Sequence, residues 1–321
     1  MTSLVGSRTL GVRSNPLSTT VDLIRTARPR QWVKNVLVLA APFAGRSLFE
    51  PHVAGRAFLA LLAFTAAAAA TYCLNDVRDA ATDRRDAVRA TRPVAAGRVS
   101  ANAASVTALA LGATSLALAA LLGWQTLVVL IMYLALTTLY STRLKHMAVL
   151  DVLAVAGGFL LRAVAGGVAT GTRLSDWFLL VALFGSLFLV AAKRSAEQVR
   201  CSGEATAGEA ASGGAASGGA ASRRAVLDIY PASWLQQMTT MALTGAVVSY
   251  AMWAFQYLGA DIAPPLLAAS LVPFLAGMMR YALLVTRGAG ETPERLLLAD
   301  RFLLIAGGLW VSVLGVALYL V

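Results

Sequence analysis

Long apolar runs separated by short polar connections follow one another along most of the chain. A helix needs about 17 to 25 apolar residues to cross a bilayer, and runs of this kind predict nine membrane-spanning helices. The first run is short and contains Pro42, so we expect it to be kinked or only partly inserted. The pattern therefore predicts an all-α, polytopic membrane protein. The predicted spans are about 36–50, 56–74, 103–122, 125–141, 149–170, 177–192, 233–257, 263–286 and 302–320.

Two segments depart from the apolar pattern. Residues 1–20 are polar and lack the apolar core of a signal peptide, which predicts a disordered cytoplasmic tail. Residues 202–222 consist mainly of Ala, Gly and Ser, a composition that predicts a flexible cytoplasmic loop. Helices on both sides of that loop can still pack together, so we expect residues 21–321 to form a single transmembrane domain.

Of the chain's 321 residues, 58% are hydrophobic and 13% are charged. This composition excludes an ordinary soluble domain, a disordered chain and a disulfide-rich scaffold. Two cysteines and two histidines are too few for a thiolate or histidine metal site, so any chemistry must use carboxylates, arginine, lysine and hydroxyl groups. The Walker, GxGxxG, HExxH and GxSxG motifs are absent from the sequence, which argues against ATP-driven transport, nicotinamide redox and acyl hydrolysis.

The basic residues that give the net charge of +11 are distributed unevenly between the two predicted sides of the membrane. Of the 27 Lys and Arg residues, 23 lie in predicted loops on the side of the N-terminus, three lie on the other side and one lies within a span. The positive-inside rule places the more basic side in the cytoplasm. We therefore expect a multi-pass protein of the inner (plasma) membrane, with a cytoplasmic N-terminus and no nucleic-acid partner. A basic cytoplasmic face also favours anionic lipids and anionic substrates.

A carboxylate-rich segment directly after the second predicted span is the strongest candidate for chemistry. If the helix continues, Asn75, Asp76, Asp79 and Asp83 share a face about 100° wide. Carboxylates on one face repel each other unless a cation neutralises them, and Mg²⁺ prefers such oxygen ligands. The alternative is a solvated helix end of mixed charge.

Arginines are interleaved with these carboxylates. A simple metal-binding site would not need them, whereas a metal-bridged phosphate or diphosphate needs both kinds of charge. The arginines are Arg78, Arg84, Arg85, Arg89, Arg92 and Arg98.

Polar residues also interrupt the apolar pattern at four other places on the predicted cytoplasmic side. A single Lys or Arg there is compatible with a side chain that snorkels to the interface. Together the residues predict the rim of one cytoplasmic-side cavity. They are Lys34 and Asn35; Tyr140, Ser141, Lys145 and Asp151; Lys193, Arg194 and Glu197; and Arg280 and Tyr281.

Arg162 lies inside the fifth predicted span, three helical turns after Asp151. A charged residue at this depth is costly and marks either a functional cavity or a structural ion pair; the sequence leaves both open. Four nearby glycines predict close helix packing and not a phosphate loop. They are Gly157, Gly158, Gly166 and Gly167.

The motif N-D-x-x-D-x-x-x-D at 75–83, followed by RPVAAG at 92–97, resembles the first Asp-rich motif of the UbiA superfamily of intramembrane prenyltransferases. The resemblance extends to helix count and motif order over nearly the whole chain. It implies a UbiA-like bundle of nine helices with a cytoplasmic-side cavity.

Finer features are similar to one branch of that superfamily, the decaprenyl-phosphate phosphoribosyltransferases. They include RPRQWVKN at 28–35, LDVLAVAGGFLLRAVAGG at 150–167 and KRSAE at 193–197. KRSAE stands where quinone-type members carry a second Asp-rich motif, so the chain departs from those members.

The branch implies Mg²⁺-dependent transfer of a 5-phosphoribosyl group from phosphoribosyl pyrophosphate to a polyprenyl (decaprenyl) phosphate. Diphosphate is released, and the product serves arabinan cell-wall precursor synthesis. The resemblance implies that Asp76, Asp79 and Asp83 are catalytic and hold Mg²⁺ with Asn75. A homo-oligomer is compatible with the sequence. The implied substrate-binding residues are Lys34, Arg78, Arg84, Arg92, Tyr140, Ser141, Lys145, Asp151, Arg162, Lys193, Arg194, Glu197, Arg280 and Tyr281.

Three alternative functions compete with this one. Prenyl transfer to an aromatic acceptor is disfavoured by the missing second Asp-rich motif. A transporter would use Arg162 and the polar vestibule as a path, but the polar residues lie almost wholly on one side. A scaffold for anionic lipids accounts for the cations and leaves the co-facial carboxylates unexplained.

Overall fold

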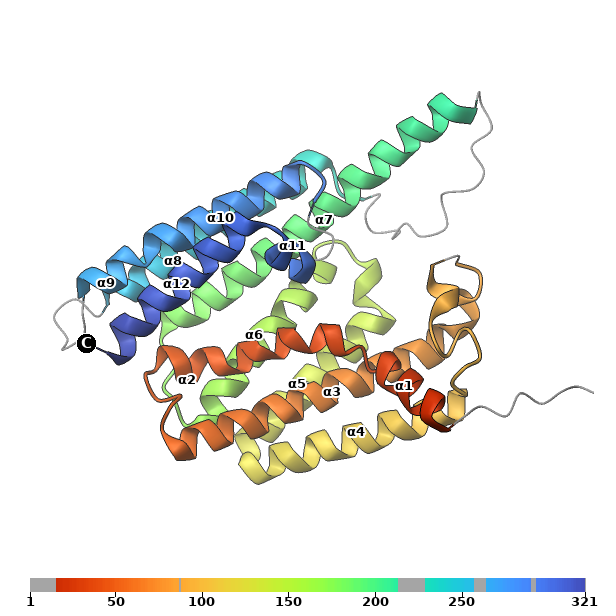
Figure 1. The fold of residues 1–321 in the computed structure, drawn as a ribbon, viewed down its shortest axis with the longest axis horizontal. Coiled ribbons are helices and arrows are strands. Elements are labelled where there is room, and N and C mark those ends of the chain that lie inside the picture. Colours follow the sequence, from red (N-terminus) through yellow and green to blue (C-terminus); the bar gives the residue numbers. More distant parts are fainter. Residues whose placement is uncertain (1–15, 87, 213–228, 257–263, 290–292, 321) are drawn as a thin grey trace, which may run out of the picture.

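The structure, a computed structural model, describes residues 16–86, 88–212, 229–256, 264–289 and 293–320 (Figure 1). All regular elements within these residues are helices, and eight stretches are long and apolar enough to span a membrane. The predicted all-α membrane bundle is thus confirmed. The eight candidate spans are α3 (Pro51–Asp83), α4 (Ala101–Leu122), α5 (Trp124–Thr142), α6 (Leu150–Thr170), the Asp176–Val199 part of α7 (Asp176–Ser212), α8 (Ala232–Phe255), Pro265–Thr286 across α9 (Pro264–Ala269) and α10 (Leu271–Thr286), and α12 (Arg301–Tyr319).

The segment predicted as the first span, 36–50, does not form a membrane-length α-helix. It contains the end of a 3₁₀ helix, η1 (Pro29–Leu39), and the short α2 (Ala40–Ala44). Pro42 has no N–H to donate, so it cannot make the i→i−4 hydrogen bond that would continue a regular α-helix back to Val38. A 3₁₀ helix rises about 2.0 Å per residue, so η1 is longer than an α-helix of the same number of residues. It lies beside α3 (Figure 1). Among the described residues, eight stretches are membrane-length helices against nine predicted spans, and the irregular segment is the one that was expected to be kinked or only partly inserted.

Two groups of helices meet along α6. In Figure 1, α3, α4 and α5 lie on one side of the bundle, while α7, α8, α10 and α12 lie on the other. α6 contacts η1, α3 and α5 within the first group and α7 within the second. Most of its buried residues are Ala and Gly, which allow helices to approach closely inside a membrane.

Glycines at the end of α6 make this approach possible. A Cβ atom on Gly166 would lie 1.8 Å from the carbonyl oxygen of Val38 in η1, and one on Gly167 would lie 2.5 Å from the Leu174 side chain. No side chain fits at either position. The predicted close packing is confirmed for these two glycines.

Arginines at the end of the bundle opposite to Asp83 are bound to helix C-termini. Arg56 donates from Nε to the Ala169 carbonyl and from Nη2 to the Leu122 carbonyl, each at 2.6 Å. Arg46 donates to the Leu318 carbonyl at 2.7 Å. The last carbonyls of a helix lack hydrogen-bond partners within it, so these cations supply hydrogen bonds to the C-terminal carbonyls of α4, α6 and α12.

Helix also enters both segments that were expected to be irregular. α1 (Pro16–Thr26) begins within the predicted tail 1–20, and α7 continues to Ser212 inside the predicted loop 202–222. Alanine and glutamate in that part of α7 favour helix. The remaining residues of both segments, 1–15 and 213–222, lie outside the described residues.

Candidate active site

The Asp-rich motif occupies the last turns of α3, which continues unbroken to Asp83. Asp76 and Asp83 are each 2% exposed, and Asn75 and Asp79 are half-buried. The expected continuation of the helix is therefore correct, and two of the motif's carboxylates are withdrawn from solvent.

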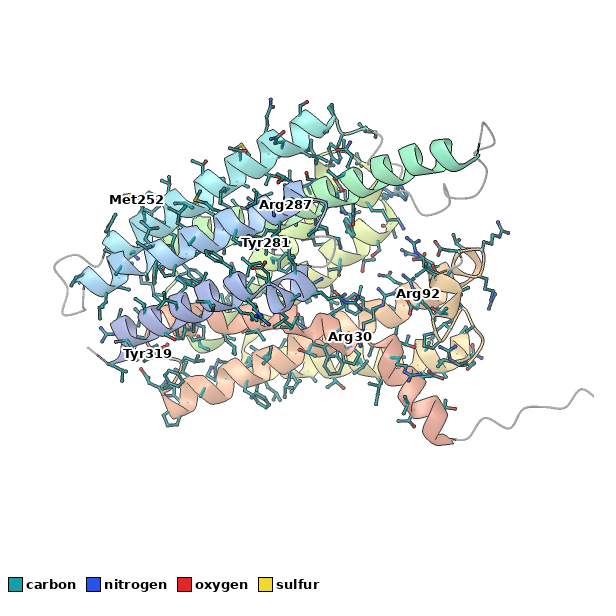
Figure 2. The ribbon with its side chains drawn as sticks, turned by 45° about the horizontal axis from the view of Figure 1, so that its top comes forward. Arg30, Arg92, Met252, Tyr281, Arg287 and Tyr319 are labelled. Atoms are coloured by element: carbon teal, nitrogen blue, oxygen red, sulfur yellow. The ribbon has the colours of Figure 1, made fainter. Side chains whose placement is uncertain are left out.

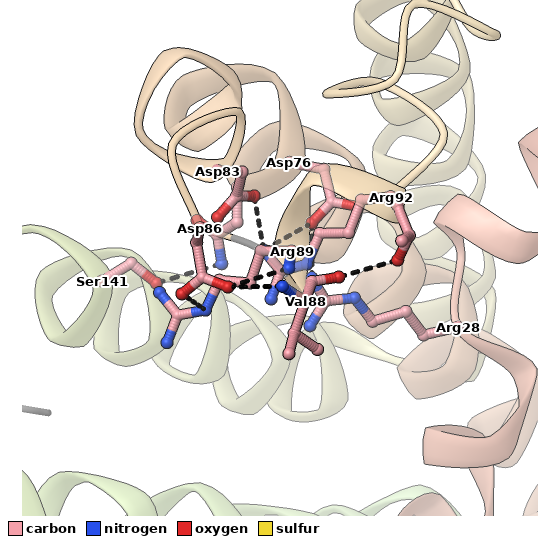
Figure 3. Close-up of polar contacts among 10 residues, drawn as sticks. Arg28, Asp76, Asp83, Asp86, Val88, Arg89, Arg92 and Ser141 are labelled. Carbon is pink, nitrogen blue, oxygen red and sulfur yellow. Dashed lines mark hydrogen bonds and ion pairs between the residues drawn. The ribbon is translucent and has the colours of Figure 1, made fainter. Parts of the chain in front are cut away.

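Two arginines from outside α3 neutralise the buried carboxylates (Figure 3). Arg92, in the loop after α3, places Nη1 2.6 Å from Asp83 Oδ2 and 3.6 Å from Asp76 Oδ1. Arg28, just before η1, donates from Nη2 to Asp76 Oδ1, and its guanidinium lies 5.2 Å from the centre of the Tyr72 ring. Three segments thus converge on one charged cluster, which we call the Asp-rich cluster (Arg28, Asp76, Asp83, Arg92).

The end of α5 is tied to the same face of α3. Asn75 Nδ2 donates to Ser141 Oγ at 3.2 Å, and Arg78 Nη2 donates to the Ser141 carbonyl at 2.9 Å. Arg84 donates from Nε to the Ala95 carbonyl at 3.1 Å, which holds the loop after α3. Asn75, Arg78 and Ser141 are thus brought together, as their assignment to one site requires.

A second charged cluster surrounds Arg194 of α7. Its Nε lies 3.0 Å from Asp151 Oδ2, its Nη1 lies 3.0 Å from Glu197 Oε2, and its Nη2 lies 3.3 Å from the Tyr140 hydroxyl. Lys193 Nζ lies 3.9 Å from Glu197 Oε1. Arg194 is 3% exposed and Asp151 is fully buried, so the ends of α5, α6 and α7 are joined by charge.

A cavity of about 100 Å³ opens beside this cluster. Its lining combines three cationic side chains with aliphatic and aromatic ones. Such a surface suits an amphiphilic anion, because the head group meets positive charge and the chain meets apolar side chains. The lining residues are Lys34, Tyr140, Val155, Phe159, Leu189, Val190, Lys193 and Arg194.

Arg162 is buried one layer behind the cavity. It donates to the Asn35 side-chain oxygen at 2.8 Å, to the Gly158 carbonyl at 2.9 Å and to the Tyr133 hydroxyl at 2.8 Å. Its guanidinium lies 5.4 Å from the centre of the Phe159 ring, and Phe159 lines the cavity. Arg162 therefore supports the cavity wall through neutral partners. Of the two alternatives that the sequence left open, this arrangement agrees with support of a cavity, and no carboxylate is among its described partners.

Three of the residues expected around the cavity lie elsewhere. Arg280 forms a two-point ion pair with Asp300, with Nη2 2.8 Å from Oδ2. Tyr281 is 2% exposed and packs against Phe188; in Figure 2 it lies among the helices of the second group, away from Arg92 at the end of α3. Lys145 is half-buried in the 3₁₀ turn Leu144–His146. None of the three lines the cavity described above. The rim predicted from the sequence is therefore wrong for α10, which contributes no residue to the lining.

Sequence reasoning missed three partners of the predicted site residues, two of them in the charged clusters. Arg28 lies 48 positions from Asp76, and Tyr230 lies 79 positions from Asp151. Asp300, the partner of Arg280, begins the last helix. Arg28 stands inside the RPRQWVKN segment, which was a usable signal, whereas nothing in the pattern around Tyr230 relates it to α6.

The oxygen donors of α3 fit a hard divalent cation. Asp76, Asp79, Asp83 and Asn75 offer carboxylate and amide oxygens along one helix face, which Mg²⁺ prefers. Within the described part of the chain, no three Asp, Glu, His or Cys side chains form a ready-made metal cage. Mg²⁺ commonly completes its coordination with waters and substrate phosphates, so these residues fit a cation that arrives with an anionic substrate.

Comparison with known proteins shows which family the chain is similar to. The model of the UbiA prenyltransferase family matches residues 36–306. A decaprenyl-phosphate phosphoribosyltransferase of Mycobacterium tuberculosis is 39% identical over 310 residues, which cover 95% of this chain and 97% of that protein. The protein of the same name from Corynebacterium glutamicum is 38% identical over 96% of this chain and 90% of its own length.

Solved structures with a similar fold are known. The structure of a UbiA homolog from Archaeoglobus fulgidus bound to GPP and Mg²⁺ superimposes with a TM-score of 0.62. It covers 94% of this chain and all of that chain at 19% sequence identity. At this level of identity the likeness concerns the fold.

Proposed function

This chain belongs to the UbiA prenyltransferase family, and from that premise we propose that it transfers a 5-phosphoribosyl group from phosphoribosyl pyrophosphate to a polyprenyl phosphate. The relatives named decaprenyl-phosphate phosphoribosyltransferase support this reaction, because they align along nearly the whole chain at 38–39% identity.

One observation carries the choice of substrates. The two charged clusters differ in composition: the first holds the α3 carboxylates Asp76 and Asp83 with their arginines, whereas the second contributes Lys193 and Arg194 to the cavity lining. A site for a single metal-bound diphosphate needs the first cluster, and a second, separate phosphate needs the second cluster. Two anionic substrates meet this requirement, with the lipid chain of the acceptor against the apolar cavity wall.

In the proposed reaction, Asn75, Asp76, Asp79 and Asp83 are the residues that would hold Mg²⁺ when the donor binds. A divalent cation at this position supplies charge neutralisation to the leaving diphosphate. Arg92 lies close enough to the carboxylates to contact the same diphosphate.

The acceptor is held by the second cluster, where Arg194 and Lys193 contact its phosphate and Lys34 and Tyr140 face the donor. An oxygen of the polyprenyl phosphate attacks C1 of the ribose, a new C–O bond forms, and the bond from C1 to the diphosphate oxygen breaks. The acceptor phosphate is already ionised, so no general base is needed. Positioning and fixed charge supply the catalysis, and in-line displacement inverts C1.

We also propose that the end of the bundle with both clusters faces the cytoplasm. The distribution of 23 of 27 basic residues supports this orientation. Phosphoribosyl pyrophosphate would then reach the site from the aqueous side, and the lipid acceptor from the bilayer.

Label transfer in membranes tests the function. Membranes containing the protein are incubated with Mg²⁺, radiolabelled phosphoribosyl pyrophosphate and decaprenyl phosphate, and label is counted in the organic-extractable lipid. We expect transfer that requires the acceptor and stops with EDTA. Absence of transfer in membranes that instead consume a prenyl diphosphate and an aromatic acid would reject phosphoribosyl transfer and leave the family unchanged.

A further inference from the structure

The start of α6 is a strained turn. Val149, directly before the helix, has φ 68° and ψ −49°, and Leu150 N–H donates to the Ala148 carbonyl at 2.8 Å. A three-residue turn with positive φ is rare, and a β-branched residue is especially unfavourable in it. Such a conformation persists only where the surrounding structure fixes it, and it is common at functional sites.

The Tyr230 hydroxyl fixes this turn. It accepts a hydrogen bond from Val149 N–H at 2.6 Å. Tyr230 is 4% exposed, its ring is stacked on Trp234 at 4.7 Å between centres, and its carbonyl accepts from Gln198 Nε2 at 2.7 Å. Contacts with α6, α7 and α8 therefore leave the phenol little freedom.

The same hydroxyl reaches the cavity through two side chains. It donates to Asp151 Oδ1 at 2.5 Å, and Asp151 Oδ2 accepts from Arg194 Nε at 3.0 Å. Asp151 is fully buried and has no exposure to water, so its two oxygens are held by these two donors. Burial and the hydrogen bond to Asp151 raise the pKa of Tyr230 to about 12, and the hydroxyl remains a donor at neutral pH.

We propose that Tyr230 is a positioning residue for the lipid phosphate: its hydroxyl orients Asp151, and Asp151 in turn fixes the guanidinium of Arg194 in the cavity. This inference rests on the proposed function, in which Arg194 binds the acceptor phosphate. Tyr230 itself does not line the cavity, so its effect on the ligand passes through Arg194.

Binding of a short polyprenyl monophosphate tests the assignment without any transfer reaction. Farnesyl phosphate is titrated into the purified full chain in detergent by calorimetry. We expect Tyr230→Phe, which keeps the ring stack and removes the hydroxyl, to weaken binding about tenfold, in line with the loss of a buried hydrogen bond to a charged group.

Tyr250→Phe is the matched control. Tyr250 is equally buried and its hydroxyl is also hydrogen-bonded, to Ser270 at 2.6 Å and to Trp310 at 2.8 Å, but none of these residues lines the cavity. This variant should bind farnesyl phosphate as the wild type does, even if its Tm falls as much as that of Tyr230→Phe.

A double-mutant cycle tests whether Arg194 carries the effect. In an Arg194→Gln background, Tyr230→Phe should cause no further loss of affinity, because the group that it positions is gone. Equal losses in both backgrounds, or wild-type affinity in Tyr230→Phe, would reduce Tyr230 to a packing residue.

Val149→Gly keeps the test decisive if Tyr230→Phe does not fold. Glycine removes the strain of the positive φ, so the turn no longer depends on the phenol. The double variant should fold and still bind about tenfold more weakly than Val149→Gly alone; equal affinity would overturn the inference, as would a wild type that does not bind farnesyl phosphate. Failure of label transfer with this binding pattern intact would reject only the proposed function.

Discussion

At the scale of single residues, the buried carboxylates are the most informative feature. Four aspartates are buried within the described residues, and each forms an ion pair with at least one arginine. Buried ion pairs contribute little net stability, because desolvation offsets the attraction between the charges. Their retention at one end of a membrane bundle is better explained by ligand binding, since carboxylate and guanidinium groups held in place need no reorganisation when a charged substrate arrives. These aspartates are Asp22, Asp76, Asp83 and Asp151.

Asp83 and Asp86 offer a comparison of neighbouring carboxylates. Asp83 is buried against Arg92, whereas Asp86 accepts the backbone N–H groups of Arg89 and Val88 and closes a turn. Those hydrogen bonds lower the pKa of Asp86. The carboxylate of Asp86 therefore stabilises the turn after α3 (Figure 3). We expect Asp83→Asn to lower transfer at least about 100-fold and Asp86→Asn to change it only slightly, as measured by label in extractable lipid. Equal losses in the two variants would contradict the assignment of Asp83 to the site.

Asp300 predicts a pH-dependent contribution to stability. Hydrogen bonds from Arg280 and from Leu303 N–H lower the pKa of Asp300. A carboxyl whose folded-state pKa lies below its unfolded value stabilises the fold above the unfolded pKa, and this contribution is lost as the pH falls through the folded-state pKa. The Tm of Asp300→Asn should therefore lie below that of the wild type from pH 8 to about 5, with the difference shrinking below about pH 4. A difference that grows on acidification would contradict this account.

At the scale of elements, hydropathy was sufficient for the spans that are regular α-helices. It failed at η1, because the pattern of apolar residues does not distinguish an α-helix from a 3₁₀ helix of greater rise. Hydropathy also gives the end of a span and not the end of its helix: the sixth predicted span ends at 192, whereas α7 continues to Ser212, since alanine-rich polar sequence favours helix outside the membrane as well.

The site was predictable to the extent that it is local. Asn75, Asp76, Asp79 and Asp83 could be grouped because one helix carries them, and helical spacing fixes their common face. Periodicity could not group Arg28 and Tyr230 with their partners, because those contacts depend on how η1 packs on α3 and how Tyr230 packs against α6. Long-range packing of this kind leaves no periodic signal in one sequence.

The close contact between α6 and η1 predicts a large effect of one methyl group. A Cβ on Gly166 would overlap the backbone oxygen of Val38, and a backbone atom cannot rotate away. We expect Gly166→Ala to destabilise the fold by about 1–3 kcal/mol or more and to lower transfer by displacing η1, which carries Lys34. Thermal unfolding of the purified protein measures the effect.

Gly315→Ala provides the control for that substitution. It adds the same methyl group to a membrane helix, and nothing lies within 4 Å of its Cβ position. Its Tm should equal or slightly exceed that of the wild type, because alanine is the better helix former. If both variants unfold at the wild-type temperature, the tight packing of α6 on η1 is incorrect.

At the scale of the whole molecule, charge and structure agree on a polarised bundle. Both charged clusters and the cavity lie at the end where α3 and α5 finish. At the opposite end, Arg46 and Arg56 are bound to helix carbonyls. These two exceptions to the charge asymmetry therefore have structural roles, which strengthens the topological reading of the remaining basic residues.

Site-directed labelling tests this orientation. In a chain with Cys73→Ala and Cys201→Ala, a single cysteine is introduced by Val88→Cys near the Asp-rich cluster or by Arg173→Cys at the opposite end; both positions are exposed. The positive-inside rule predicts that a membrane-impermeant maleimide labels Arg173→Cys in intact cells and labels Val88→Cys only after permeabilisation. Equal labelling of the two variants in permeabilised cells controls for reactivity. Labelling of Val88→Cys in intact cells would place the site outside, where cytoplasmic phosphoribosyl pyrophosphate could not reach it. That result would reject the proposed reaction and leave the fold unchanged.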